Sequence, residues 1–259
     1  METSIMKKHK ENRGLGMQMN DNFIRKISVD WNKIEPDSFL CNIPALHNLH
    51  ELEFKKNTTF FVGGNGAGKS TLLEAIAVAY GFNPEGGTLN YRFNTYDEVS
   101  EFSKSISITK GFRKGITNYF FRAESFFNVA SHSVEYGSTY GGRFLHEQSH
   151  GEGFLAFFQE FDKPGLYIMD EPEAALSPQR QLALFIHIAE MAKGGAQFII
   201  TSHSPILLGL PEAEIISFEN GKIERCSYED TESYQVTEMF INNREILTKR
   251  LLSGSEREK

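Results

Sequence analysis

The fold of this chain is decided by the stretch Gly63-Gly64-Asn65-Gly66-Ala67-Gly68-Lys69-Ser70, with Thr71 directly after it. The stretch fits G-x-x-x-x-G-K-[ST], the pattern of a phosphate-binding loop. The apolar residues 58–62 before it are typical of a buried strand, and residues 72–80 after it carry apolar side chains at helical spacing. Because the motif requires a strand, a loop and a helix in this order, the flanking sequence favours a phosphate-binding loop over a glycine-rich turn with a chance lysine.

The residue types in this loop suit the binding of a polyphosphate. Glycines allow backbone N–H groups to turn inward, and the N-terminus of the following helix adds a partial positive charge. Lys69 is expected to reach the β- and γ-phosphates, and the hydroxyl of Ser70 is expected to ligate Mg²⁺.

Two adjacent acids, Asp170 and Glu171, follow the continuous apolar run 166–169. Such a run is typical of a strand in a parallel sheet that is covered on both faces. Ligands of open α/β sheets bind where the strands end, so we expect Asp170 to hold Mg²⁺ through water and Glu171 to polarise an attacking water. A solvated acidic turn is the alternative interpretation.

Two further segments are candidates for the same site. His203 follows the next predicted strand, 197–201, and this position favours a functional role over packing. Ser149, with Glu152 three residues later, forms a capping box before an apolar helical stripe. The local sequence leaves two interpretations of Ser149 and Gly151 open, a helix start or a second anion-binding helix N-terminus.

Elsewhere the patterns predict ordinary α/β elements. Ser177-Pro178 is expected to start a helix whose buried face consists of Leu182, Phe185, Ile186, Ala189 and Ala192. Asn220-Gly221 predicts a hairpin between strands 214–218 and 222–227. Residues 232–252 are expected to form one or two helices around Asn242-Asn243.

Composition limits the classes of function. A net charge of −7 over 259 residues argues against a surface coated with basic residues for nucleic acid, although a local basic groove stays open. Two distant cysteines suggest a reducing compartment, and we find neither a signal peptide nor an apolar run of membrane-spanning length. We therefore expect a cytoplasmic protein with a disordered tail (1–20), one domain (21–252) carrying an inserted lobe at about 82–150, and a frayed tail (253–259).

Together these motifs resemble those of the ABC-class ATPases over about residues 23–227. Residues 63–70 look like the Walker A motif, and 166–171 look like Walker B with its catalytic glutamate. Ser149-His150-Gly151-Glu152 resembles a degenerate signature motif, 174–177 lies where the D-loop falls, and His203 matches the switch histidine. The Asp-Glu-Pro-Glu stretch is most similar to the small stand-alone ATPases of the RecF-like and overcoming-lysogenisation-defect branch.

The resemblance implies an α/β fold of the P-loop NTPase, ABC-ATPase type, a mixed β-sheet flanked by helices with a small inserted lobe. It also implies Mg²⁺-dependent ATP hydrolysis, with Glu171 and His203 as catalytic residues, Ser70 and Asp170 at the metal, and residues 63–71 around ATP. Family members work as head-to-tail dimers, in which Lys69 and Ser70 would face Ser149 and Gly151 of the partner subunit.

The chain also departs from the family pattern. It has no glutamine between 71 and 147, where the family has one near Mg²⁺, and it has His150, Glu152 and Ser177 at positions where other residues are common. The resemblance suggests that ATP binding and hydrolysis drive or gate a partner protein in DNA repair or phage defence. A contact with DNA is not evident from the sequence. Two alternatives are a slowly hydrolysing ATP switch for a nuclease or toxin partner and, less favoured, the ATPase subunit of a transporter.

Overall fold

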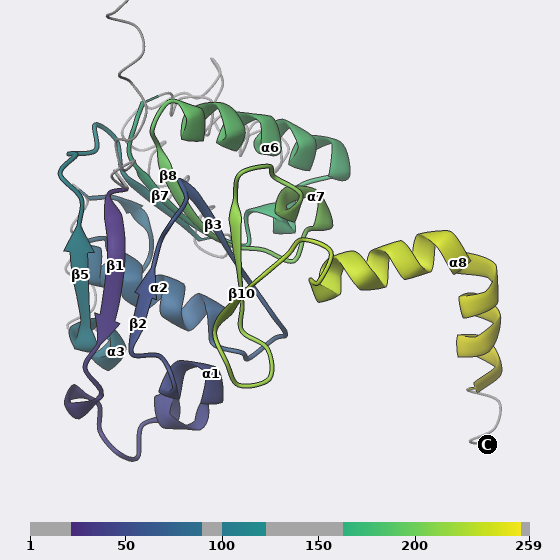
Figure 1. Ribbon diagram of the computed structural model, residues 1–259, viewed down its shortest axis with the longest axis horizontal. Coiled ribbons are helices and arrows are strands. Elements are labelled where there is room, and N and C mark those ends of the chain that lie inside the picture. Colours follow the sequence, from purple (N-terminus) through teal and green to yellow (C-terminus); the bar gives the residue numbers. More distant parts are fainter. Residues whose placement is uncertain (1–21, 90–99, 123–162, 255–259) are drawn as a thin grey trace, which may run out of the picture.

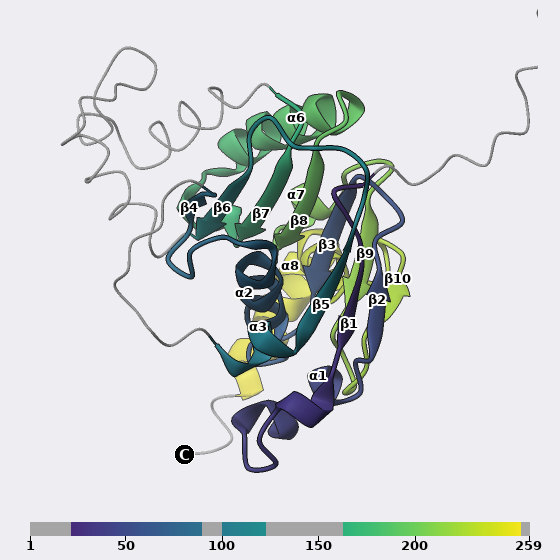
Figure 2. The same ribbon diagram turned by 90° about the vertical axis from the view of Figure 1, so that its left-hand side faces the viewer.

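The computed structural model describes residues 22–89, 100–122 and 163–254, which form two β-sheets with helices packed on both sides of the larger one (Figures 1 and 2). The strands are β1 (Ile24–Val29), β2 (Glu51–Glu53), β3 (Thr58–Val62), β4 (Gly87–Thr88), β5 (Ile106–Lys110), β6 (Tyr119–Arg122), β7 (Leu166–Asp170), β8 (Gln197–Thr201), β9 (Glu214–Ser217) and β10 (Glu224–Cys226). The α-helices are α1 (Pro44–His47), α2 (Lys69–Tyr80), α3 (Glu101–Ser105), α6 (Pro178–Lys193), α7 (Pro205–Leu208) and α8 (Glu232–Gly254). Short 3₁₀ turns are η1 (Trp31–Lys33), η2 (Phe39–Asn42) and η4 (Pro172–Ala175).

The larger sheet has the strand order β10-β9-β3-β8-β7-β6-β4. Its inner strands β9, β3, β8, β7 and β6 run parallel, whereas β10 and β4 pair antiparallel at the two edges. The strands β3 and β8 are buried along their whole length. This is the burial expected of parallel strands that are covered on both faces. The carboxyl ends of the parallel strands therefore meet at one edge of the sheet, where the candidate site lies.

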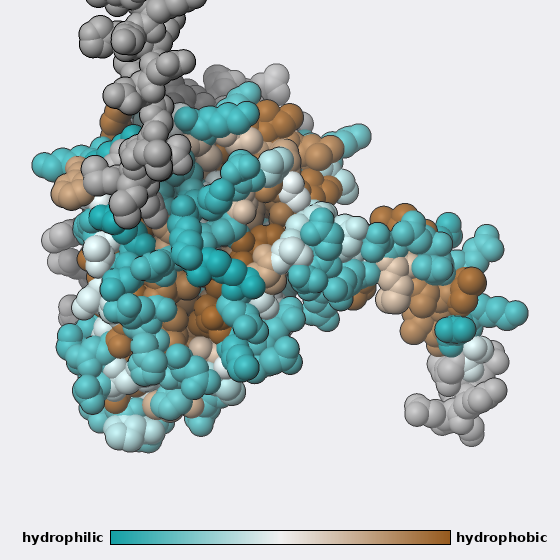
Figure 3. Space-filling model, in the orientation of Figure 1, coloured by the Kyte–Doolittle hydropathy of each residue, from teal (hydrophilic) through white to brown (hydrophobic). Residues whose placement is uncertain are grey.

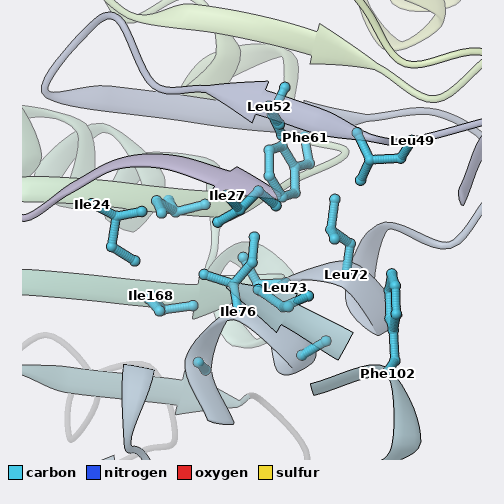
Figure 4. Close-up of a cluster of buried hydrophobic side chains, with 14 of the residues drawn as sticks. Ile24, Ile27, Leu49, Leu52, Phe61, Leu72, Leu73, Ile76, Phe102 and Ile168 are labelled. Atoms are coloured by element: carbon cyan, nitrogen blue, oxygen red, sulfur yellow. The ribbon is translucent and has the colours of Figure 1, made fainter. Parts of the chain in front are cut away.

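Alternate side chains of these strands enter two separate cores, because successive residues of a strand point to opposite faces. Phe61 and Ile168 face α2 and the smaller sheet, where they pack with Leu72, Leu73 and Ile76 (Figure 4). Their neighbours Phe60, Tyr167 and Met169 face α6 and α7. Helix α2 is thus held between the two sheets, which fixes the position of the glycine-rich loop that precedes it.

A buried glutamine links the two sheets. The smaller sheet has the antiparallel order β2-β1-β5 and packs against the other side of α2. Gln197, at the start of β8, donates from Nε2 to the Ile24 carbonyl (2.9 Å) and accepts from the Ile24 N–H through Oε1 (2.8 Å). The side chain of Gln197 therefore pairs with the first residue of β1 in the same way that a neighbouring strand would.

Most of the elements expected from the sequence are present. The predicted strands at 58–62 and 197–201 coincide with β3 and β8, and a strand and a helix flank the glycine-rich loop as expected. Asn220 (φ 53°) and Gly221 (φ 70°) both adopt the left-handed conformation that a tight hairpin requires. Helix α8 consists of two helices joined at a kink at Asn243. The expected α/β fold with a mixed sheet flanked by helices is confirmed.

The predicted buried face of α6 is only partly right: Phe185, Ala189 and Ala192 are partly buried and pack against the core, but two of the predicted residues do not. Leu182 and Ile186 are exposed (52% and 55%), whereas Leu184, Ile188 and Met191 are buried against the sheet. The helix carries apolar residues on more than one side, so the helical period alone admits two registers. The contact with the face of the sheet formed by Tyr167 and Phe198 determines which register is buried.

The described part of the lobe expected at about 82–150 belongs to the two sheets. Strands β4 and β6 extend the larger sheet, and β5 completes the smaller one. The other residues of the expected lobe, those of the expected tail at 1–20, and residues 255–259 of the expected tail at 253–259 lie outside the described residues, whereas residues 253 and 254 end α8. Among the helices that the structure describes, none has both the length and the apolar character needed to cross a membrane.

Replacing Gln197 with methionine tests the link between the sheets. The change keeps the length of the side chain but leaves the buried N–H and C=O of Ile24 without partners. We expect the free energy of unfolding to fall by about 1–3 kcal/mol for each backbone group, measured by denaturant unfolding. Gln179→Met, on the exposed side of α6, is the matched control and should change stability by less than about 0.5 kcal/mol. Equal effects of the two substitutions would contradict this account.

Candidate active site

The glycine-rich loop runs from the end of β3 to the start of α2 and needs glycine at particular positions. Gly68 has φ 95°, and a Cβ atom there would lie 2.8 Å from Leu46 Cγ. Gly63 has φ 137°, and a Cβ atom there would lie 3.2 Å from Phe218 Cβ. Larger residues at either position would be strained, so the loop conformation depends on both glycines.

Lys69 is the first residue of α2, and its ammonium group lies inside the loop. Nζ donates to the carbonyls of Gly63 (2.7 Å) and Gly64 (2.9 Å), and the side chain is buried. Burial lowers the pKa of Lys69, while Glu171, Asp170 and Glu173 act in the opposite direction and favour its charged form. A cation therefore sits beside the N-terminus of α2, where the first N–H groups have no partners within the helix. This arrangement suits an anion.

Asp170 brings three elements together. Its Oδ1 accepts from the hydroxyl of Ser70 on α2 (2.9 Å) and from the hydroxyl of Thr201 at the end of β8 (2.6 Å). Asp170 and Thr201 are also direct partners in the β7–β8 pairing. The carboxylate of Asp170 and the hydroxyl of Ser70 are hard oxygen donors of the type that Mg²⁺ prefers, and Mg²⁺ commonly takes one or two protein ligands beside phosphate oxygens and water. The residues present therefore fit this metal.

The side chain of Glu171 points away from Ser70 and Asp170 and toward His203. Its backbone is left-handed (φ 46°, ψ 56°), and its N–H donates to the Thr201 hydroxyl (3.0 Å). Its Oε1 lies 3.7 Å from His203 Nε2, and both side chains are partly exposed (43% and 39%). Left-handed backbone is uncommon for a residue other than glycine and is often found at functional sites. The left-handed turn at Glu171 thus directs two adjacent carboxylates to different partners. Asp170 contacts Ser70 and Thr201, whereas Glu171 lies near His203.

Glu173 was not singled out by the sequence analysis, yet it holds the loop that carries His203. Its Oε1 accepts from the hydroxyl of Ser202 (2.8 Å) and from the backbone N–H groups of His203 and Ser204. Burial raises the pKa of Glu173, while the hydrogen bonds it accepts act against this rise. Its Oε2 is buried and has no hydrogen-bond partner in the part of the chain described. The sequence signal was the third acid of Asp-Glu-Pro-Glu, the last residue of that stretch.

Two other polar residues at the sheet edge were also missed. Thr201 is the shared partner of Asp170 and Glu171, and Arg122 ends β6 in register with Asp170. Nη1 of Arg122 donates to Glu74 on α2 (2.8 Å). Both residues terminate parallel strands beside β7, which is the signal that could have revealed them. The predicted residues Ser149 and Gly151 lie outside the described residues, whereas 63–71, Asp170, Glu171 and His203 converge at this edge.

Two protein-family models match the chain, and both are described as AAA domains. The first covers residues 39–140 and includes the glycine-rich loop. The second, "AAA domain, putative AbiEii toxin, Type IV TA system", covers residues 153–209 and includes Asp170, Glu171 and His203. The chain is therefore similar to AAA-type domains over both parts of the candidate site. No curated protein matches it.

Several solved structures are similar to the chain at low sequence identity. The SMC head domain from Thermotoga maritima is 16% identical, with a TM-score of 0.42, and the match covers 79% of this chain and 98% of that one. The cbiO1 protein from Clostridium perfringens, part of the ABC transporter complex cbiONQ, is 15% identical, with a TM-score of 0.44, over 87% and 97% of the two chains. Similarities this low do not bear on what the present chain binds.

Substitution of Glu173 tests its hold on the His203 loop. Glu173→Ala removes the acceptor of one hydroxyl and two backbone N–H groups, and we expect a loss of stability of about 1–3 kcal/mol. Amide exchange of residues 202–204 should accelerate more than that of β7. Glu173→Gln retains an oxygen acceptor and is the matched control, with a smaller effect on both measurements. Unchanged exchange at 202–204 in Glu173→Ala would show that the carboxylate does not hold this loop.

Proposed function

We propose that this chain binds ATP with Mg²⁺ and hydrolyses it at the edge of the larger sheet. The observation that carries the proposal is the meeting of three groups at one site. These groups are the buried Lys69 ammonium inside the glycine loop, the Ser70–Asp170 pair, and the Glu171–His203 pair. A cation, two hard oxygen donors and an exposed carboxylate with a histidine suit the binding, neutralisation and hydrolytic attack of a polyphosphate.

The residues of the glycine loop would bind the phosphates. Loop residues 63–68 and the first turn of α2, with Ser70 and Thr71, offer backbone N–H groups, and Lys69 offers a positive charge that is already positioned by two loop carbonyls. Ser70 and Asp170 would hold Mg²⁺. When bound, this ion would neutralise negative charge on the phosphate oxygens.

The two acids of the strand end would have separate tasks. Asp170 is directed to Ser70 and Thr201, whereas Glu171 is partly exposed and lies beside His203. We propose that Glu171 accepts the proton of the attacking water and that His203 orients the transferred phosphate. Glu173 acts through the backbone of residues 202–204, and its part is to position His203.

The full site is proposed to need a second subunit. In this arrangement Ser149 and Gly151 of the partner subunit complete the surroundings of the γ-phosphate. The proposal rests on the resemblance of 149–152 to a signature motif and on the partly exposed Glu171 and His203.

Lys69→Ala should weaken ATP binding, because it removes the buried positive charge from the loop. Charge-assisted hydrogen bonds contribute about 1.5–3 kcal/mol, which corresponds to a loss of affinity of about 10- to 100-fold. Isothermal titration calorimetry with Mg-ATP measures the change. Lys33→Ala, on an exposed turn, should leave the affinity unchanged. Equal affinities of the Lys69→Ala and wild-type proteins would show that the glycine loop does not bind the nucleotide.

Glu171→Gln should abolish turnover and retain ATP binding, because it keeps the shape of the side chain but removes its basicity. General-base catalysis contributes about 10²- to 10⁴-fold, and we expect a loss of that size in phosphate release. Asp170→Asn should instead reduce the Mg²⁺ dependence of binding. Light scattering after size exclusion should show that Glu171→Gln forms a larger assembly with Mg-ATP than without it. Wild-type turnover in Glu171→Gln would overturn the assignment of the base.

A further inference from the structure

The C-terminal helix α8 extends away from the body of the molecule as an arm of residues 232–254 (Figure 1). Large apolar side chains on it are exposed, among them Phe240 (46%), Ile241 (70%), Ile246 (58%) and Leu251 (70%), and hydrophobic residues are visible along the arm in Figure 3. The kink at Asn243 divides α8 into two short helices, and isolated helices of fewer than about 12–15 residues are marginally stable in water, so most helical stability in proteins comes from packing of an apolar face. The arm therefore presents a face suited to packing.

The root of the arm is firmly attached to α7. Tyr228 donates its hydroxyl to the Pro205 carbonyl (2.8 Å), and its ring packs edge-on against Tyr234 of α8 (centroids 4.7 Å apart). Thr231 is buried, and its hydroxyl donates to the Tyr228 carbonyl (2.7 Å). The direction in which the arm leaves the body is thus set by these contacts.

A cavity of about 400 Å³ opens beside this root. Its wall includes Leu208, Leu210, Ile215, Cys226 and Tyr228, which come from α7, β9, the edge strand β10 and the segments that directly follow α7 and β10. Arg225 also lines the cavity, but its Nε donates to Glu214 (2.9 Å) and its Nη2 to the Glu53 carbonyl, so its charge is already matched. Leu208, Leu210 and Ile215 are buried, and Ser227 and Glu229 also line the wall, so the partly buried Cys226 and Tyr228 supply the apolar surface that an aliphatic side chain would contact. We call this cavity the root groove.

The charges of the root groove and of the outer arm are opposite. Residues 219–232 carry five carboxylates and two cations, and Glu219, Glu224 and Asp230 lie close enough to Cys226 to help burial raise the pKa of its thiol to about 11. Residues 244–250, beyond the kink, carry three cations and one carboxylate. One chain therefore holds both halves of a complementary pair, and the outer half of the arm extends away from the root groove (Figure 1).

We propose that the arm of one copy docks in the root groove of a second copy, and reciprocally, to form a dimer that needs no nucleotide. Two-fold symmetry brings the outer arm of each copy to the root of the other when the arms pack antiparallel. Ile246 enters the groove, while Lys249 and Arg250, three and four positions later on the same side of the helix, meet the carboxylates at its rim. Leu251 lies on another side of the helix and packs against the arm of the second copy. This interface lies at the opposite end of α7 from His203 and is separate from the ATP-dependent contact proposed above.

The apolar part of the interface is tested with the full-length chain in the absence of nucleotide, by light scattering after size exclusion. The wild type should be a dimer at micromolar concentration. Ile246→Ser with Leu251→Ser should weaken dimerisation at least about tenfold. Phe112→Ser with Ile116→Ser removes two apolar side chains of comparable or greater exposure elsewhere and should have no effect. A monomeric wild type, or equal behaviour of the two double variants, would overturn the proposal.

Charge reversal distinguishes a second copy from any other occupant of the groove. Lys249→Glu with Arg250→Glu reverses the charge of the outer arm. Glu224→Lys with Glu229→Lys reverses the charge at the rim of the root groove. Each double variant alone places like charges at both contacts and should dimerise at least about tenfold more weakly. In the mixture both contacts have opposite charges, so native mass spectrometry should show a heterodimer that forms as tightly as the wild type. A mixture no better than its components would overturn the proposal.

The same measurements separate this proposal from the proposed ATPase function. Lys69→Ala should dimerise through the arm as the wild type does, even if ATP binding is lost. The Ile246→Ser/Leu251→Ser protein should bind ATP with wild-type affinity, because α8 contributes nothing to the glycine loop. Loss of ATP binding in the arm variant would show that the arm acts on the ATP site itself. It would overturn the proposal that the arm forms an interface separate from that site.

Discussion

The site depends on one carboxylate, that of Asp170, which ties three elements together at the edge of the sheet. Its Oδ1 accepts hydrogen bonds from Ser70 on α2 and Thr201 on β8, and its own strand β7 lies next to β8. Strands β3 and β8 are buried along their lengths, so polar side chains are tolerated chiefly where strands end. The packing that forms the core therefore also concentrates hydroxyls, carboxylates and the Lys69 ammonium at one edge.

Because polar side chains gather where the buried strands end, the strand, loop and helix around the candidate site could be predicted from sequence. A glycine loop between a strand and a helix, and acids directly after an apolar run, are local patterns whose spatial meaning is fixed by parallel strand order. The side of α6 that is buried cannot be predicted from the local sequence. Apolar residues lie on more than one of its sides, and only the opposing sheet selects Leu184 and Ile188 over Leu182 and Ile186. Glu173 was missed for the same reason, because its partners lie about thirty residues away along the chain.

Glu173 and Asp170 divide the support of the site between them. Asp170 organises the side of the site formed by α2, whereas Glu173 holds the backbone of residues 202–204 on the other side. Between them Glu171 adopts a left-handed conformation, which turns its carboxylate toward His203. Backbone strain of this kind persists when the surroundings determine it from several directions. The hydrogen bonds from Glu171 N–H to Thr201 and from the 202–204 loop to Glu173 provide such surroundings.

The short helix α7 connects this site to the arm. Ser204, next to His203, caps α7 by accepting from the N–H groups of Ile206 and Leu207, and its hydroxyl donates to Gln181 of α6. Pro205, the first residue of α7, accepts the hydroxyl of Tyr228 at the root of the arm. Tyr228 and Pro205 therefore join the root of the arm to the turn that carries His203. Because Glu173 and Gln181 hold residues 202–204 from the body of the molecule, the position of His203 is set there and does not depend on what the outer arm contacts.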